Sequence, residues 1–514
     1  MPSTTTLTAR LQARSDDDRL ADLQAVHALH QQYVPVWRKL LDAYEGSGGF
    51  LDGSYLWRYP NEVEKEFRQR QEQARYHNFV KTLVNLFVRH VFREGVKRDT
   101  TDERLIAFWA NADGAGRAID VVMKRAAKMA LPIGHVGLLL DKTQKEASGP
   151  SRADEKAEPF LALYLPQAIL DWRQNRHDDL LGVKLLEDAP QEDILAPPPH
   201  DVRDRQQYLI WTQDEWARFD GKGEFVEDAV HNLSVVPLIM LRPEPSAAQP
   251  FLGQSLIGNA NVVTALYNRC SEEDEVLREQ AFSILTVNVP VDGDVEKVKA
   301  QIGTDVGPTR ALVAQGSINY ITADMGVAAT IRDTIAFLIQ EIYRAAHVRF
   351  QRDSLDSESA EAIRLQHTEL NEMLAGLAAE LTSAEKQICR VWFAWMQPGD
   401  LAAAEQAMEA AQVSITYPRE FFTRDLVEDI KMLADAFRLQ LGETFEKRAK
   451  KRLARQMDPD ADGQTRTQIE EEIDQLQTAG ATMAQDAAEQ LRQSTQKRLA
   501  AFTKPFPVEE GAAA

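Results

Sequence analysis

The chain has 514 residues, of which 44% are hydrophobic and 27% charged, and its formal net charge is -20. A chain of this length exceeds one compact core, so we expect about two to four domain-like units. The acidic balance argues against a protein that grips nucleic acid over a broad surface, because such binding depends on Lys and Arg displacing counterions from phosphates. It is compatible with a conduit through which DNA slides under weak attraction.

The sequence carries no sign of a membrane segment or of export. No window approaches the ~18 to 20 unbroken apolar residues that span a bilayer, and residues 1–20 lack the apolar core of a secretory signal. We therefore expect a protein that is made in a cytoplasm and has no membrane partner. Cys270 and Cys389, the only cysteines, fall on predicted helices among apolar neighbours, which predicts free thiols rather than a disulfide.

The N-terminal part of the chain is predicted to be helical. Residues 1–25 are polar enough for a loose arm or a first helix, and apolar residues near helical spacing predict a helix over 25–43. The stretch EGSGGFLDGSYLWRYP is interpreted as a loop packed down by its aromatic residues, and it lacks the spacing of a phosphate-binding loop. Two further helices are predicted over 104–111 and 116–131, the second closed by Pro132 and Gly134.

One long helix is predicted over residues 61–93, with a charged first half and an apolar second half, FVKTLVNLFVRHVF. His77 and His90 lie on this helix. A metal site there would need a partner at i+4 or a companion carboxylate, which the pattern does not supply. Both side chains are therefore interpreted as packing or surface histidines.

From Gly134 the pattern changes to strands. Apolar runs separated by polar or Pro-rich connectors predict antiparallel strands at HVGLLLDK, FLALYLP, LLGVKLLED, QQYLIWT, EWARFD and VVPLIML. Helices come first and strands afterwards, which is typical of an α+β domain. In the phrase YLPQAILDWR, Tyr164 and Trp172 are interpreted as core aromatics.

Residues 251–397 form the stretch around which the rest is organised. A helix predicted over 256–282 is roughly 40 Å long at ~1.5 Å per residue. Strands predicted at 284–289 and 311–321 follow, with a short helix EKVKAQI between them, and a return helix is predicted over 327–344. The tip module between the two long helices is too small for a core of its own, which implies neighbours that complete it.

A second long helix is predicted from about residue 357 to 396, and its apolar stripe indicates a central spine. The stripe is not a strict heptad, so packing within a domain is favoured over a coiled coil. AAAEQAMEAA is helix or linker, SITYP is a short strand, and residues from 423 onward are predicted to form a separate helical region.

Two stretches of the C-terminal region were tested for binding chemistry. Residues 458–463, DPDADG, begin like a calcium loop, but position 12 is Ile469 rather than a bidentate carboxylate, so an acidic turn is the alternative. The basic run EKRAKKRLAR at 446–455 is either a contact for DNA or an acidic partner, or a solvated helix face. No metal, cofactor or catalytic motif occurs, so we expect a protein that is not an enzyme.

The order of these parts, and several phrases within them, resemble the portal proteins of tailed bacteriophages. The resemblance covers about residues 25–475 and is carried by YVPVWRKLLDAYEG, FVKTLVNLFVRHVFREG, YLPQAILDW, GQSLIGNANVVTALYNRCSEEDEVLREQAFSILTV and DSESAEAIRLQHTELNEMLAGLAAELTSAEKQICRVWFAW.

That resemblance implies an α+β, predominantly helical fold with the named parts of a portal. These parts are a wing over 1–250 and 359–420, stem helices over 251–283 and 326–345, a clip over 284–325, a tunnel loop over 346–358, and a helical crown with its tail over 421–514.

The resemblance also implies a function and a set of partners. The chain would assemble, in the host cytoplasm, into a ring of about twelve subunits. The ring would sit at one capsid vertex of the virion and carry double-stranded DNA during packaging and ejection. Its implied partners are the terminase large subunit, the major capsid protein or scaffold, and a head-tail adaptor protein.

Within this reading, basic residues of the tunnel loop and clip are candidates for weak, non-specific phosphate contacts. They are Arg349, Arg352, Lys297, Lys299 and Arg310. Surface charges paired with neighbouring acids are the alternative interpretation of each. The competing hypothesis for the whole chain is a helical scaffold or adaptor protein of a large assembly without a DNA channel.

Overall fold

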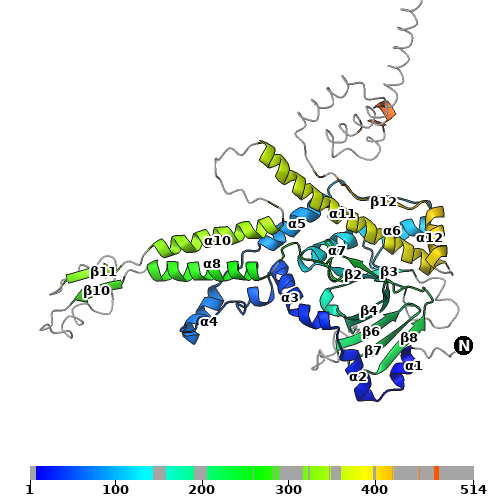
Figure 1. Cartoon of the computed structure of the whole chain (residues 1–514), viewed down its shortest axis with the longest axis horizontal. Coiled ribbons are helices and arrows are strands. Elements are labelled where there is room, and N and C mark those ends of the chain that lie inside the picture. Colours follow the sequence, from blue (N-terminus) through cyan, green and yellow to red (C-terminus); the bar gives the residue numbers. More distant parts are fainter. Residues whose placement is uncertain are drawn as a thin grey trace, which may run out of the picture. The chain divides into compact units, whose positions relative to one another are not determined.

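The computed structural model describes residues 7–142, 158–189, 205–258, 260–281, 284–288, 317–321, 325–346, 348, 360–397, 401–419, 421, 451, 468–469 and 471–473. The chain divides into two compact units, Met1–Phe421 and Phe422–Ala514. All elements named below belong to the first unit, and Figure 1 labels most of them.

Helices and antiparallel strands are mixed in this unit, as the sequence predicts. The helices are α1 (Leu7–Gln12), α2 (Asp16–Gln24), α3 (Ala28–Glu45), η1 (Gly48–Phe50), α4 (Glu64–Gln73), α5 (Phe79–Val91), α6 (Glu103–Ala110), α7 (Ile119–Ile133), η2 (Pro166–Ala168), α8 (Ala260–Ala281), α10 (Met325–Ala345), α11 (Ala360–Met396) and α12 (Leu401–Ala410).

The strands form four sheets. They are β1 (Lys97–Asp99), β2 (Val136–Asp141), β3 (Phe160–Tyr164), β4 (Ile169–Gln174), β5 (Leu180–Asp188), β6 (Gln206–Thr212), β7 (Glu215–Asp220), β8 (Phe225–Val230), β9 (Leu238–Leu241), β10 (Ile284–Asn288), β11 (Ser317–Ile321) and β12 (Ser414–Thr416). The sheet orders are β4-β5-β6-β7-β8, β3-β2-β9, β10-β11 and β1-β12.

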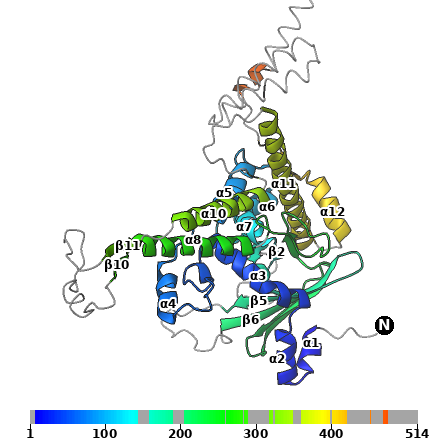
Figure 2. The same cartoon turned by 60° about the vertical axis from the view of Figure 1, so that its left-hand side comes forward.

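The five-stranded sheet is a meander that buries both of its faces. Alternate residues point to opposite faces of a strand. On one face Tyr208 and Phe219 pack against Leu23 of α2, and Figure 2 shows α1 and α2 beside this sheet. On the other face Trp211 packs in a second cluster that includes Trp37 of α3. The predicted core aromatics Tyr164 and Trp172 are buried in this second cluster, which confirms that interpretation.

The largest core joins the helices. Residues of α3, α5, α6, α7, α8, α10 and α11 share one hydrophobic cluster, together with parts of β2, β9 and β12. Helix α11 is 37 residues long, about 55 Å at ~1.5 Å per residue. Its Leu374, Leu377, Leu381, Ile388 and Trp392 are all buried in this cluster. The predicted spine helix is thereby confirmed as an element packed within its own unit.

A buried ion cluster holds α11 to two short strands. Glu385 of α11 is 0% exposed and receives the guanidinium of Arg98 from β1, with Arg98 Nη2 at 3.0 Å from Oε2. Arg98 also binds Asp120 of α7 at 2.8 Å, and the hydroxyl of Tyr417 donates to Glu385 at 2.8 Å. Burial of the guanidinium opposes its charge, but the hydrogen bonds and charge of Glu385 outweigh it and raise the pKa of Arg98.

The prediction of one helix over 61–93 is wrong. The chain breaks between α4 and α5, at residues 74–78. Tyr76 leaves the helical path to stack on Phe50, with ring centres 4.3 Å apart, and its hydroxyl donates to the Ala43 carbonyl at 2.7 Å. Asn78 then caps α5 by accepting from Lys81 N–H at 2.8 Å. These tertiary contacts outweigh the local preference for a continuous helix.

Three strands escaped the sequence analysis. Strand β8 is exposed at every residue, so it lacks the alternation that marks a half-buried strand, and only its pairing with β7 defines it. Strand β1 has only three residues, and it is defined by its pairing with β12 across more than three hundred positions of sequence, Lys97 opposite Thr416. Its partner β12 was predicted, as the short strand SITYP. Strand β4 follows directly on the phrase YLPQA and was not predicted as a strand.

Candidate functional site

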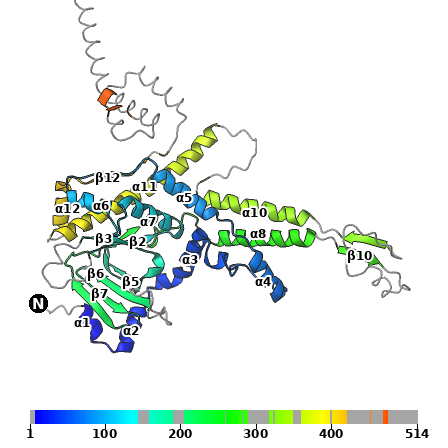
Figure 3. The same cartoon turned by 180° about the vertical axis from the view of Figure 1, so that it is seen from behind.

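The pair of long helices α8 and α10, with the ladder β10-β11 between them in sequence, is the candidate functional site. The two helices pack side by side and run in opposite directions, as Figures 1 and 3 both show. β10 and β11 pair antiparallel, from Ile284 opposite Ile321 to Asn288 opposite Ser317. The predicted order of helix, strand, strand and helix is confirmed. The short helix predicted between the strands lies outside the described residues.

The first half of α8 is anchored in the core. The side chain of Asn268 is fully buried and ties α8 to the loop that follows α3. Its Oδ1 accepts from Trp57 N–H at 2.7 Å, while its Nδ2 donates to the carbonyls of Tyr55 and Thr264 at 3.1 and 2.8 Å. Because every polar group of this amide is satisfied, Asn268 fixes the start of the long helix without a desolvation penalty.

Aromatic contacts extend the anchor. Tyr267 of α8 lies edge-on to Phe50, with ring centres 5.4 Å apart, and the ring of Tyr76 lies 6.1 Å from it. At the other end of the pair, Tyr343 of α10 contacts Phe79 of α5, with ring centres 6.2 Å apart. Both long helices therefore begin or end against the same helical core.

The second half of α8 is acidic, and arginines neutralise most of it. Glu272 pairs with Arg269 and accepts from Tyr59, Glu275 pairs with Arg278, and Glu273 pairs across the helices with Arg332 of α10 at 2.5 Å. Burial raises the pKa of the Glu272 carboxyl. Asp274, also in this run, is exposed. The surface is consequently a nearly balanced field of charges.

Helix α10 carries two large apolar side chains on its exposed side. Val327 is 52% exposed and Phe337 is 58% exposed, whereas Ile335, Leu338 and Ile339 of the same helix are partly buried against the core. Isolated exposed apolar residues are ordinary on protein surfaces. Two on one helix, ten residues apart, leave α10 with apolar surface that the described part of this chain does not cover.

The thiols of both cysteines are unreactive. Cys270 and Cys389 are free, as predicted. Burial raises the pKa of Cys270 to about 11, helped by Glu273 and Asp274, and burial raises that of Cys389 to about 12. At neutral pH both are protonated thiols, which are poor nucleophiles and poor metal ligands.

Searches for other chemistry find none in the described part of the chain. There, no group of three or more His, Cys, Asp or Glu is placed to hold a metal ion, and no helix has the length and hydropathy to cross a membrane. His77 is exposed and His90 half-buried. A surface hollow of about 820 Å³ lies near the start of α6 and against α12, and no Ser, Cys, His or Lys lines it.

The sequence-predicted contact residues cannot be compared with this geometry. Arg349, Arg352, Lys297, Lys299 and Arg310 all lie outside the described residues, as do residues 458–463 and all of the basic run 446–455 except Lys451. Sequence reasoning missed Asn268 and Arg332. Asn268 is polar and nothing in the local sequence marks it as a core residue, yet its side chain is buried.

No model of a known protein family matches the sequence, and no curated protein matches it. Solved chains of gene transfer agent (GTA) particles are similar at 13% identity. One from the neck of an empty particle, computed with C6 symmetry, is covered over 87% of its length by 71% of this chain, with a TM-score of 0.39. One from the virion of the native particle is covered over 87% of its length by 71% of this chain, with a TM-score of 0.40. One from the neck of the native particle, computed with C12 symmetry, is covered over 98% of its length by 80% of this chain, with a TM-score of 0.41.

Proposed function

We propose that this chain is a subunit of a phage-type portal ring that conducts double-stranded DNA at one vertex of a capsid. The observation that supports this most is the α8–β10–β11–α10 order, in which two long helices lead to a small two-stranded tip and back. It is the arrangement that the sequence resemblance implies for stem and clip. The resemblance supplies the remaining parts of the proposal: wing, tunnel loop and crown.

The exposed side of α10 supports assembly through copies of the chain. Fully burying a Val or Phe side chain is worth about 1.5–3 kcal/mol, and Val327 and Phe337 are each more than half exposed. A contact in which one subunit's α10 meets a different surface of the next is heterologous, and such contacts close into rings when the rotation fits. The tip, two strands of five residues, also gains a core only from neighbours.

The charges of the α8–α10 pair suit a duplex that slides. Three of the four acids in the run 272–275 have arginine partners, so the surface offers a polyanion neither strong attraction nor uniform repulsion. By the resemblance, the proposed partners are the terminase large subunit, a head-tail adaptor, and the major capsid protein or scaffold, and the proposed location is the virion. The proposed role is mechanical, without catalysis.

Assembly through α10 gives the first test. Wild-type protein is expected to form a discrete particle of about a dozen chains, measured by size-exclusion chromatography with light scattering. Replacing Val327 and Phe337 together with Asp is expected to shift the protein toward monomer. Each lost contact costs about 1.5–3 kcal/mol of burial for the two side chains together, because only about half of each is exposed and available for a contact. The penalty for burying charge comes in addition.

A matched control places the same two charges elsewhere on α10. Ala329 and Gln340 are exposed positions of that helix, and Asp at both is expected to leave the particle size unchanged. A wild-type protein that stays a monomer or dimer at high concentration would instead favour the scaffold or adaptor hypothesis. Equal disruption by both variants would remove Val327 and Phe337 from the interface.

Passage of DNA gives the second test. Changing Arg349 and Arg352 to Glu is expected to leave ring assembly intact but to reduce the DNA packaged or retained per capsid, because repulsion replaces weak attraction along the channel. The DNA content of purified capsids measures this. The corresponding changes at Lys297, Lys299 and Arg310 test the clip. Normal packaging in the double variant would remove Arg349 and Arg352 from the channel role.

A further inference from the structure

We propose that a basic cluster on α5, β1 and α7 binds the phosphate backbone of duplex DNA. The cluster consists of Arg89, Arg93, Lys97, Lys124, Arg125 and Lys128. It is built from segments near 90 and 125 in the sequence, which the fold brings together. It lies on other elements than the α8–α10 pair and requires no ring, so it goes beyond the function proposed above.

Three contacts bring together the segments that carry these residues. Helices α5 and α7 pack together in the core. The amino group of Lys124 lies 5.4 Å from the centre of the Phe92 ring. Phe92 directly follows α5 and precedes Arg93 in the sequence. The ion pair of Arg98 with Asp120 at 2.8 Å holds β1 against the first turn of α7. It places the backbone of Lys97 near that turn, and the Lys97 side chain leaves the strand on the face opposite that of Arg98.

No described residue forms an ion pair with the positive charges of the cluster. None of its six side chains forms an ion pair or a side-chain hydrogen bond within the described part of the chain, whereas arginines of α8 and α10 are paired with acids. Five of the six are exposed, and Lys128 is half-buried. The nearest acids in sequence are Glu94, Asp99 and Asp120, and Arg98 already occupies Asp120. On a chain of net charge -20, a local group of positive side chains attracts an anionic partner.

Two ordinary explanations account for only part of the cluster. Cations in the last turn of a helix are favoured by its dipole, which applies to Arg89 of α5. Contact with an aromatic face applies to Lys124. Neither applies to Arg93, Lys97, Arg125 or Lys128. Burial lowers the pKa of His90, and the charge of Arg93 adds a smaller effect in the same direction.

The chemistry of the surface favours a phosphate backbone over an acidic protein. Protein interfaces are depleted of charge at their centre and enriched in aromatic side chains. Around the cluster the exposed large apolar residue is Val121, 49% exposed, and the aromatic ring present, Phe92, is buried. Interfaces with duplex DNA are polar and strongly positive, and they tolerate an open surface of long, flexible cations. Such contacts carry no sequence information.

The experiment measures binding of a short, mixed-sequence DNA duplex to the full chain by fluorescence anisotropy. Wild-type protein is expected to bind at about 50 mM salt and to weaken steeply by about 200 mM. Changing Arg93 and Lys124 together to Glu is expected to weaken binding by about tenfold or more and to reduce the slope of log affinity against log salt by about 2.

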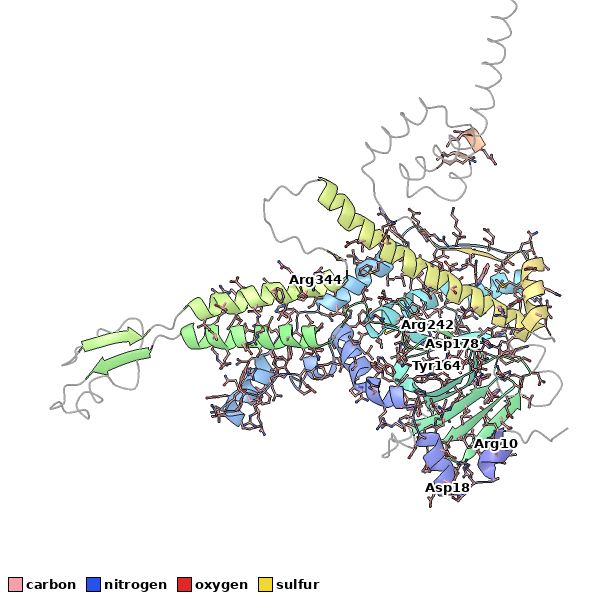
Figure 4. The ribbon with its side chains drawn as sticks, in the orientation of Figure 1. Arg10, Asp18, Tyr164, Asp178, Arg242 and Arg344 are labelled. Atoms are coloured by element: carbon pink, nitrogen blue, oxygen red, sulfur yellow. The ribbon has the colours of Figure 1, made fainter. Side chains whose placement is uncertain are left out.

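A control variant changes the net charge of the protein by the same amount at two positions outside the cluster. Arg10 of α1, labelled in Figure 4, and Arg176 in the turn between β4 and β5 are exposed and lie on other elements. Changing both to Glu is expected to leave affinity within about twofold. If the glutamate variant at Arg93 and Lys124 melts early, the R93Q and K124Q pair, which removes charge without reversing it, carries the same comparison.

Three results would overturn the proposal. The first is wild-type protein that fails to bind the duplex at low salt. The second is equal loss of affinity in the cluster and control variants. The third is binding of poly-glutamate as tight as that of DNA, which would point to an acidic protein partner instead. Light scattering on the same samples distinguishes a failure of this proposal from a failure of the assembly proposal. The cluster variants are expected to keep the wild-type particle size.

Discussion

Replacing Arg98 with Met is expected to lower the free energy of unfolding by about 3–5 kcal/mol, because it leaves the buried carboxylate of Glu385 without its counter-charge. Glu385 is 0% and Arg98 9% exposed, so water cannot take the place of the guanidinium. The Tyr417 hydroxyl remains as a single donor at 2.8 Å. Urea unfolding followed by circular dichroism measures the change.

Two variants separate the ion pair from simple packing. Changing Arg98 to Met and Glu385 to Leu together removes both charges and is expected to recover most of the lost stability, as apolar replacements of buried ion pairs do. Changing Tyr417 to Phe removes one hydrogen bond to a charged group and is expected to cost about 1.5–3 kcal/mol. A loss below about 1 kcal/mol in the Arg98 variant would show that Glu385 is not buried as a charge.

The second large effect is expected at Gly134, the residue that ends α7. Its φ is +109°, and a Cβ there would lie 2.4 Å from the carbonyl oxygen of Gly253. Neither backbone can yield easily, because the hydroxyl of Ser255 donates to the Pro132 carbonyl at 2.6 Å and holds the two segments together. Changing Gly134 to Ala is expected to cost about 2–6 kcal/mol, combining backbone strain with overpacking.

Gly95 provides the control for that effect. Its φ is +74°, and a Cβ there would meet nothing within 4 Å. Changing Gly95 to Ala therefore imposes only the left-handed conformation, at a cost of about 1–2 kcal/mol. Both variants are measured by the shift of the urea midpoint at constant slope. Equal midpoints for the two would show that the close approach of Gly134 and Gly253 is not retained in solution.

Local periodicity explains what could be predicted from the sequence. The apolar spacing of α8, α10 and α11 predicted three long helices to within a few residues, because each helix buries one continuous stripe. Most strands of the two larger sheets were predicted for the same reason, since alternate residues lie on buried faces. The break between α4 and α5 was missed, because Tyr76 and Asn78 act through contacts with α3.

Of the candidate sites, one could be predicted from the sequence and the other could not. The order of helix, two strands and helix was visible in the sequence, and so was the absence of any recognised catalytic motif. The basic cluster was not, because Arg93 and Lys124 are thirty-one positions apart and each segment looks ordinary alone. Arg93 lies in the turn after α5, and Lys124 lies within α7. Only the packing of α5 on α7 makes them neighbours.

By itself the sequence determined most of the helices and strands, that both cysteines are free, and that two long helices flank a small strand pair. The tertiary structure decided where charges meet: Arg98 with Glu385, Arg332 with Glu273, and the cations of α5 with those of α7. The physical reason is the sequence separation between the residues that determine each feature. Periodicity depends on residues within a few positions of each other, whereas an ion pair or a charged surface depends on which elements pack together.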